Sequence, residues 1–145
     1  IAAEQPQTEQ PAPAKAKDIS GLHLLLVEDN ALNAEIAAAL LADRGVSVEL
    51  ARDGSEAVRM FREAPAGTYA GIIMDIMMPV MDGLTATRAI RALERADAKT
   101  IPIIAMTANA FEEDARQCLA AGMNVHLAKP LCMEELVAIL ARLCA

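Results

Sequence analysis

Residues 22–30 read LHLLLVEDN, an apolar run that passes directly into two acids, Glu28 and Asp29. A short apolar run bounded by polar residues is typical of a strand that is covered on both faces. Four comparable runs follow along the chain: VSVEL (46–50), AGIIMD (70–75), IPIIAM (101–106) and MNVHLA (123–128). The sequence therefore predicts five strands.

Helical patterns separate these runs. Apolar residues recur at a spacing of three and four, which predicts amphipathic helices. The residues that carry the pattern are Leu32, Ile36, Ala39 and Leu40, then Val58 and Phe61, then Phe111, Ala115, Cys118 and Leu119, and finally Leu136, Val137, Leu140 and Leu143. A further helix over Leu84–Arg95 has a thinner apolar stripe.

The predicted helix ends agree with these patterns. Asp53 with Glu56, and Asn109 with Glu112, have the spacing of capping boxes. Gly45 and Gly122 stand where a helix ends in a left-handed residue.

Strand–helix alternation predicts an α/β fold, a three-layer (βα)5 doubly wound parallel sheet with right-handed crossovers. LLLV, GIIM and IIAM are apolar at consecutive positions, as central strands must be, whereas VSVEL alternates and NVHLAK is mixed, as edge strands would be. The strand order 2-1-3-4-5 satisfies both observations. It places a topological switch, where ligands of open α/β sheets bind, between the first and third strands.

The chain divides into two parts by composition. Residues 1–20 are rich in Pro, Ala and Gln, and this predicts a flexible linker. Residues 21–145 form the predicted domain. Because the chain starts at Ile1 without a signal-peptide pattern, we expect it to be an excised piece of a longer polypeptide, with a cytoplasmic location.

Composition excludes two classes of partner. The net charge is −7, which is opposite to the basic footprint of a nucleic-acid binder, and aromatic residues are only 2%, too few for base stacking. No uncharged run exceeds 12 residues, well short of the roughly 20 apolar residues that span a bilayer. We therefore expect neither nucleic-acid binding nor membrane contact by this domain.

Chemistry-bearing side chains follow four of the five predicted strands. Glu28 and Asp29 follow the first strand, Asp75 ends the third, and the fourth and fifth run into Thr107 and Lys129. The carboxyl ends of parallel strands meet at one edge of the sheet, so these side chains are expected to lie together. Three converging carboxylates repel one another unless a cation compensates, and oxygen ligands suit Mg²⁺, for which Mn²⁺ is expected to substitute.

A carboxylate beside Mg²⁺ can act as a nucleophile toward a phosphoryl group. Lys129 would neutralise charge on the transferring group, and Thr107 would donate a hydrogen bond to a phosphoryl oxygen. The segment VEDNALN contains no glycine, so neither a dinucleotide fingerprint nor a phosphate-binding loop is present, and no nucleotide cofactor is expected.

At these residues the sequence resembles the receiver domain of two-component response regulators, which has a flavodoxin-like fold. The resemblance rests on LLLVEDN (24–30), MDIMMPVMDG (74–83), MTANA (106–110) and HLAKP (126–130), and it covers essentially all of residues 21–145. The residues within and around these motifs are most similar to those of receivers attached to hybrid sensor histidine kinases. The resemblance implies a domain that is not itself a turnover enzyme and that switches or relays a signal in a phosphorelay.

The resemblance also implies a partner and a role for each residue. A histidine kinase or a histidine phosphotransfer domain, in the same or a separate chain, would donate the phosphoryl group of a phosphohistidine. The implied roles are Asp75 as phosphoacceptor, Asp29 and Asp75 as direct Mg²⁺ ligands with the backbone carbonyl of Met77, Glu28 acting through water, and Thr107 and Lys129 as the family's hydroxyl and lysine.

Two positions depart from the family pattern. Three residues before the lysine the family carries an aromatic side chain that rotates inward on activation, and here it is His126. His126 is either a switch residue that works beside Thr107 with added pH sensitivity, or an edge-strand histidine without a switching role. Met77 stands at a position that tunes phosphoryl lifetime, either shielding the acyl phosphate or lying flat on the surface.

Two alternative functions remain at this point. A Mg²⁺-dependent phosphohydrolase with an aspartyl nucleophile needs a second Asp two residues later as general acid, and position 77 is Met. A degenerate receiver would serve only as a docking module, although all five site residues are intact.

Overall fold

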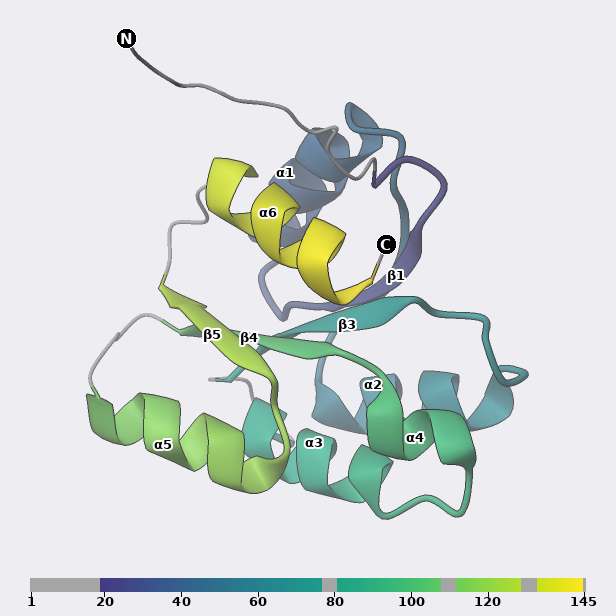
Figure 1. Ribbon diagram of the computed structural model, residues 1–145, viewed down its shortest axis with the longest axis vertical. Coiled ribbons are helices and arrows are strands. Elements are labelled where there is room, and N and C mark those ends of the chain that lie inside the picture. Colours follow the sequence, from purple (N-terminus) through teal and green to yellow (C-terminus); the bar gives the residue numbers. More distant parts are fainter. Residues whose placement is uncertain (1–18, 77–80, 108–111, 129–132, 145) are drawn as a thin grey trace, which may run out of the picture.

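The computed structural model describes residues 19–76, 81–107, 112–128 and 133–144. Its centre is one five-stranded parallel sheet with the strand order β2-β1-β3-β4-β5 (Figure 1). The strands are β1 (His23–Val27), β2 (Ser47–Ala51), β3 (Gly71–Asp75), β4 (Ile103–Thr107) and β5 (Val125–Ala128). The predicted fold class, strand order and edge strands are therefore confirmed.

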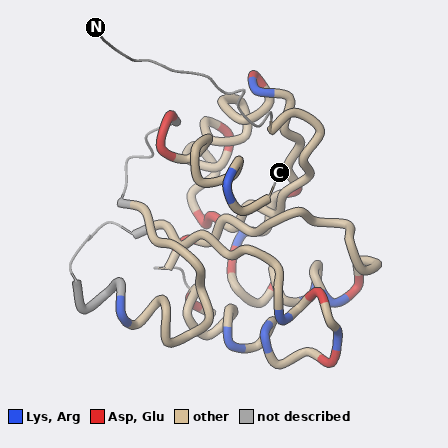
Figure 2. Tube along the Cα trace, in the orientation of Figure 1, with Lys and Arg blue, Asp and Glu red and all other residues tan. Residues whose placement is uncertain are grey.

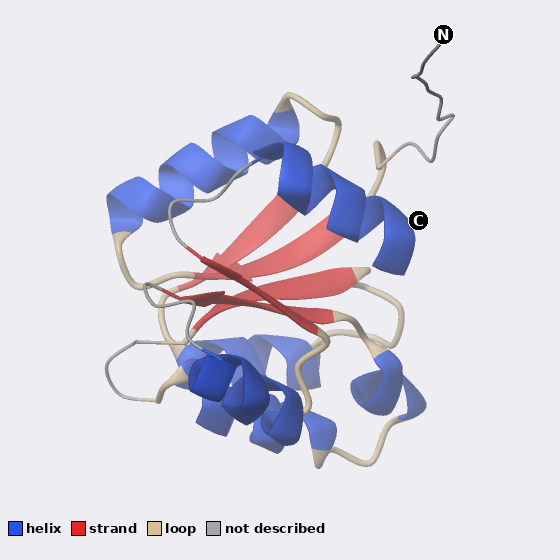
Figure 3. Ribbon diagram, turned by 60° about the vertical axis from the view of Figure 1, so that its left-hand side comes forward, coloured by secondary structure: helices blue, strands red, loops and turns tan. Residues whose placement is uncertain are grey.

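Helices cover both faces of the sheet, giving three layers (Figure 3). Helices α1 (Ala31–Ala42) and α6 (Met133–Leu143) pack on one face. The other face carries α2 (Gly54–Glu63), α3 (Gly83–Arg91), α4 (Ala96–Thr100) and α5 (Glu112–Ala121).

Burial explains why the central strands carry runs of consecutive apolar residues. All five residues of β3 and four of the five in β1 are buried. Along β1, Leu25 and Val27 join the core beneath α2 and α3, whereas Leu24 and Leu26 join the core beneath α1 and α6. Successive residues of a strand point to opposite faces, so a strand with a core on each face needs apolar residues at consecutive positions.

The helix ends that can be compared follow the predicted chemistry. The Asp53 side chain accepts a hydrogen bond from the Glu56 amide at 2.9 Å, and the Glu56 carboxylate accepts one from the Arg52 amide at 2.7 Å. Gly45 and Gly122 have φ values of 82° and 112°, the left-handed conformation predicted for them. The proposed cap Asn109 lies outside the described residues.

Helix α1 differs from the expectation raised by its apolar stripe. The spacing of Leu32, Ile36 and Leu40 predicts a helix correctly, but these side chains are 64%, 50% and 39% exposed. The buried face is instead formed by small residues and one leucine, namely Ala34, Ala37 and Leu41. Since α1 is apolar on nearly every side, periodicity alone could not show which face meets the sheet.

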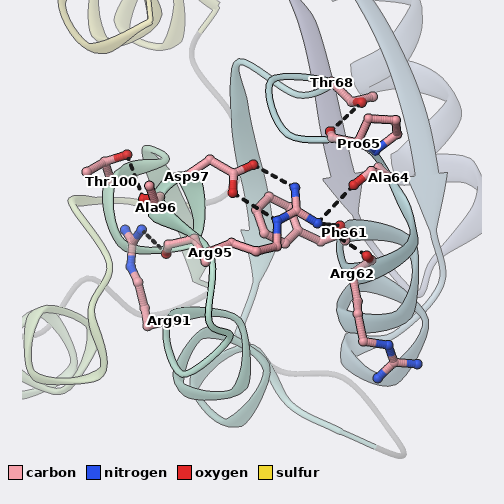
Figure 4. Close-up of polar contacts among 11 residues, drawn as sticks. Phe61, Arg62, Ala64, Pro65, Thr68, Arg91, Arg95, Ala96, Asp97 and Thr100 are labelled. Atoms are coloured by element: carbon pink, nitrogen blue, oxygen red, sulfur yellow. Dashed lines mark hydrogen bonds and ion pairs between the residues drawn. The ribbon is translucent and has the colours of Figure 1, made fainter.

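The predicted helix over Leu84–Arg95 is wrong at its C-terminal end. Helix α3 stops at Arg91, and the chain turns before a separate short helix, α4. The Arg95 guanidinium pairs with Asp97 at 2.7 Å and donates to the carbonyls of Phe61 and Ala64, both at 2.9 Å, at the end of α2 (Figure 4). These contacts require Arg95 to leave the helix axis and reach toward α2.

Charges of both signs alternate along the trace around α4 (Figure 2).

Across the described part of the chain, no helix is long and apolar enough to cross a membrane. The predicted linker falls on residues 1–20, of which 1–18 lie outside the described residues.

Candidate functional site

Two acids leave the carboxyl end of β1. The Glu28 amide donates to the carbonyl of Ala51, the last residue of β2, at 3.0 Å, so the chain keeps its strand pairing one residue beyond β1. The Glu28 carboxylate accepts a hydrogen bond from the Asn30 amide at 3.2 Å, and Asn30 caps α1 by accepting from the Asn33 amide at 2.9 Å. The cap and the strand together position both acids at the sheet edge.

Asp75 is the last residue of β3, which lies beside β1 at the predicted topological switch. Its register partner is Met106 of β4, and the next amide, that of Ile76, donates to the Met106 carbonyl at 3.0 Å. Strand pairing therefore extends past the acid on this side as well. Asp75 is only 3% exposed.

The three acids form one cluster. Carboxylate oxygens of Glu28, Asp29 and Asp75 all lie within 4.8 Å of one another. Glu28 is 5% exposed, whereas Asp29 is open to solvent. Within the described residues this is the one group of three or more His, Cys, Asp or Glu side chains that could hold a metal ion.

The donor set fits a hard divalent cation. Carboxylate oxygens, with one face open to water, match the preference of Mg²⁺ for oxygen ligands and retained waters. A cation would also offset the mutual repulsion of three negative charges held this close. The predicted convergence of the three acids is thus observed, and their chemistry can bind a cation and present Asp75 to an electrophile.

The other predicted residues are placed only in part. Thr107 is the last residue of β4 and pairs with Ala128 of β5, so its backbone stands at the same edge of the sheet as Asp75. Met77 and Lys129 lie outside the described residues.

His126 lies on β5 opposite Ala105 of β4. Ala105 belongs to the core beneath α2 and α3, and residues paired in a parallel sheet share a face, so His126 faces the same layer. The residue is half-buried, and its Nε2 is shielded from solvent without a hydrogen-bond partner among the described residues. A half-buried histidine on an edge strand is compatible with both interpretations of His126, the switch residue and the partly exposed residue without a switching role.

Two glycines that contact the chain between Asp75 and α3 were not predicted from the sequence. Gly54 and Gly83 each follow a capping aspartate and begin α2 and α3. Their backbones contact the loop that follows Asp75. The dipeptide Asp-Gly at a helix start is the one signal available in the sequence, and it is equally consistent with an ordinary turn.

An open parallel α/β sheet with an acidic cluster at its switch point defines a class of domains that can hold a divalent cation beyond the carboxyl ends of the strands. Residues 24–141 match the family model described as "Response regulator receiver domain". This match covers most of the chain, and the chain belongs to the response regulator receiver family.

Related proteins agree with this assignment. The receiver domain of a sensor histidine kinase from Pseudomonas aeruginosa, solved with a magnesium ion coordinated in its active-site cleft, is 46% identical, with a TM-score of 0.77 over 86% of this chain and 98% of that one. The receiver domain of the Saccharomyces cerevisiae response regulator Ssk1, solved with the histidine phosphotransfer protein Ypd1, is 30% identical, with a TM-score of 0.74 over 85% of this chain and 88% of the matched chain.

Among curated proteins, two-component system protein A of Emericella nidulans is 43% identical over 119 residues, which are 81% of this chain. The alignment spans 17% of that protein, and the alignment with hybrid signal transduction histidine kinase I of Dictyostelium discoideum spans 6% of that one. The chain is therefore similar to one domain of much longer signalling proteins. It is a receiver domain of two-component and phosphorelay systems, homologous to the receivers of hybrid histidine kinases.

Proposed function

We propose that this domain accepts a phosphoryl group from a phosphohistidine onto Asp75 in a Mg²⁺-dependent reaction and thereby switches or relays a signal. The observation that carries the proposal is the cluster of three carboxylates within 4.8 Å, with the buried Asp75 at its base. Asp29 supplies the solvent-facing side of the cluster, through which a donor can approach.

In the proposed step, a carboxylate oxygen of Asp75 forms a bond to phosphorus as the bond from phosphorus to the imidazole nitrogen breaks. The imidazole leaves with the electron pair of that bond and is neutral after it takes up a proton from solvent. The product is an acyl phosphate on Asp75. The pairing of β3 with β1 up to Met74 and with β4 through Asp75 holds the nucleophile in place, so little motion is needed for attack.

Asp29 and Asp75 are proposed as direct ligands of the cation, with the backbone carbonyl of Met77, and Glu28 is proposed to act through a bound water. The buried position of Glu28 and the exposed position of Asp29 are consistent with this division. Mg²⁺ supplies charge neutralisation for the phosphoryl oxygens and the carboxylates. Mn²⁺, with the same preference for oxygen ligands, is proposed to substitute.

Three further residues are proposed to respond to the phosphoryl group. Lys129 neutralises its charge, and the Thr107 hydroxyl donates to one of its oxygens, which links the site to β4. His126 is proposed as the second switch residue, because its shielded Nε2 has no hydrogen-bond partner among the described residues and a rotation of the ring would let it gain one.

The proposed partner is a histidine kinase or a histidine phosphotransfer domain, in the same or a separate chain. The exposed stripe of Leu32, Ile36 and Leu40 on α1 supports a helical partner, because it offers an apolar contact surface on the helix that begins two residues after Asp29. The Ssk1 receiver, which was solved with a histidine phosphotransfer protein, supports the same class of partner.

The parent protein is proposed to be a hybrid sensor histidine kinase in which residues 21–145 form the receiver and residues 1–20 the linker, on the cytoplasmic side. The similarity to receivers of histidine kinases supports this placement.

The test is to incubate the protein with Mg²⁺ and a small acyl phosphate and to locate any phosphoryl adduct by mass spectrometry. We expect one adduct, on Asp75, that is lost in Asp75→Asn and retained in Asp43→Asn, a matched change of an exposed acid at the end of α1. An adduct that survives Asp75→Asn would overturn the proposal. Absence of any adduct would favour a docking module, and continuous release of inorganic phosphate would favour a phosphohydrolase.

The docking surface is tested separately with Ile36→Glu, which places a charge in the middle of the exposed stripe. Phosphorylation by the small acyl phosphate should be unchanged, whereas transfer from a phosphorylated histidine phosphotransfer protein should fall. If Ile36→Glu and wild type accept the phosphoryl group from the phosphotransfer protein at the same rate, the stripe is not the docking surface.

A further inference from the structure

The loop that follows Asp75 is held at both ends by glycines that begin two helices. At one end the Gly83 amide, the first of α3, donates to the Ile76 carbonyl at 2.9 Å. At the other end the Gly54 amide, the first of α2, donates to the Met81 carbonyl at 3.0 Å. The amino ends of α2 and α3 therefore both bear on the segment between Asp75 and α3.

Neither position has room for a side chain. A Cβ on Gly83 would lie 2.3 Å from the carbonyl oxygen of Asp75 itself and 2.9 Å from the Ile76 Cα. A Cβ on Gly54 would lie 2.5 Å from the Met81 carbonyl oxygen. These obstacles are backbone atoms, which cannot rotate aside as the end of a flexible side chain can.

The need for glycine here comes from close approach. Gly45 and Gly122 adopt positive φ angles, but Gly54 and Gly83 are not among the residues with that conformation. What glycine allows at these two positions is contact between a helix end and a carbonyl oxygen. At Gly83 that carbonyl belongs to the residue whose carboxylate completes the acidic cluster.

We infer that Gly83 and Gly54 are positioning residues for the phosphoacceptor, and that their lack of a side chain determines where the Asp75 backbone lies at the sheet edge. The inference rests on the proposed function of Asp75. Gly83 acts directly on the Asp75 carbonyl, and Gly54 acts on the carbonyls of Met81 and Asp82, the two residues that precede Gly83 in the chain. A side chain at either position would push the loop outward and displace the Asp75 carboxylate from Asp29 and Glu28.

Small displacements matter in such a site because the nucleophile, the cation ligands and the transferring phosphorus must lie in one geometry. A shift of 1 Å away from the productive position can reduce the rate by about 100-fold. The displacement should also weaken cation binding, because the three carboxylates share the ion.

The experiment compares Gly83→Ala and Gly54→Ala with Gly71→Ala in the full chain. Gly71 begins β3, at the end opposite Asp75, and a Cβ there would lie 3.0 Å from the Cys144 Sγ. It therefore also crowds the protein interior but leaves the site alone. Three quantities are measured for each protein: the Mg²⁺ dissociation constant by calorimetry, the phosphorylation rate with a small acyl phosphate per folded molecule, and Tm.

All three variants should lower Tm. Only Gly83→Ala and Gly54→Ala should raise the Mg²⁺ dissociation constant several-fold and reduce the phosphorylation rate by about tenfold or more. The inference is overturned if their Mg²⁺ dissociation constants and rates remain within about twofold of Gly71→Ala. A wild-type protein that forms no adduct would refute the proposed function instead.

A second variant separates loop displacement from helix crowding. A Cβ on Gly54 would also lie 2.9 Å from the Ala86 Cβ of α3. Adding Ala86→Gly removes that contact but leaves the clash with the Met81 carbonyl. The double variant should remain impaired, and full recovery would overturn the inference. If Gly83→Ala does not fold, Gly54→Ala decides, and failure of both to fold would overturn the inference because both glycines would then serve the fold rather than the site.

Discussion

The acidic cluster should make the metal-free protein less stable than a variant that lacks one of its charges. The change that shows this is Asp29→Asn, because Asp29 is the solvent-facing member and the substitution keeps the size of the side chain. Removing the carboxylate charge relieves its repulsion with Glu28 and Asp75. We therefore expect the variant to be more stable than wild type in the absence of divalent cations.

The magnitude follows from the distance. Two unit charges 4.8 Å apart, the upper limit for this cluster, repel by about 3.5 kcal/mol at an effective dielectric constant of about 20. Water and salt screen an exposed charge such as Asp29, which reduces the gain to about 1 kcal/mol. For a domain of this size, that corresponds to a rise in Tm of roughly 3 to 5 °C.

The assay is thermal unfolding followed by circular dichroism at low ionic strength, with a chelator and then with increasing Mg²⁺. Wild type should gain stability with Mg²⁺, by about 2.7 kcal/mol at a hundred times the dissociation constant. Asp29→Asn should have a higher Tm than wild type in the presence of the chelator, and its Tm should rise little when Mg²⁺ is added. Glu35→Gln, which removes an exposed acid from α1, should change the stability of either form by less than about 0.5 kcal/mol. A lower Tm for metal-free Asp29→Asn than for metal-free wild type would refute the reasoning.

Three further predictions concern the supporting structure. The pKa of Tyr69 is raised to about 12 by burial and by the hydrogen bond that the Tyr69 hydroxyl donates to Glu49 at 2.9 Å. The stability that this effect contributes should be complete below about pH 10 and lost as the pH rises through about 12. Ultraviolet titration of this single tyrosine should show a midpoint that Glu49→Gln lowers. Thr87 is fully buried and its hydroxyl has no hydrogen-bond partner among the described residues, so Thr87→Val should raise the free energy of unfolding by about 1 kcal/mol in denaturant titrations, and a loss would show that the hydroxyl is paired. Arg95→Ala removes contacts with three carbonyls at the end of α2 and should lower Tm more than Arg59→Ala, whose guanidinium pairs only with its own helix among the described residues; equal shifts would contradict this assignment.

Much of the fold was predictable because, in this architecture, the composition of a strand indicates whether it lies at the centre or at the edge of the sheet. A strand buried on both faces must be apolar at consecutive residues, and β1, β3 and β4 satisfy this. Helix α4 was not predictable in the same way. The break after Arg91 depends on the reach of Arg95 to α2, a contact between residues more than 30 positions apart in the chain.

The face of α1 illustrates a second limit. Leu32, Ile36 and Leu40 have the spacing of a core stripe, yet the sheet is met by Ala34 and Ala37 with Leu41. Small residues allow a helix to pack close to a sheet, and the larger side chains then remain outside. Periodicity predicts that a helix forms, but on a helix that is apolar all round it cannot select the buried face.

The sequence by itself determined the five-stranded order and the carboxylates at one edge, because parallel strands bring their carboxyl ends together. Only the tertiary structure decided how these groups differ: Glu28 and Asp75 are 5% and 3% exposed, whereas Asp29 faces solvent. It also revealed why Gly54 and Gly83 are glycines, since the carbonyl oxygens that exclude a side chain come from a distant part of the chain or from across a loop. Distances of this kind depend on how helices and strands pack, and no local pattern of residues encodes them.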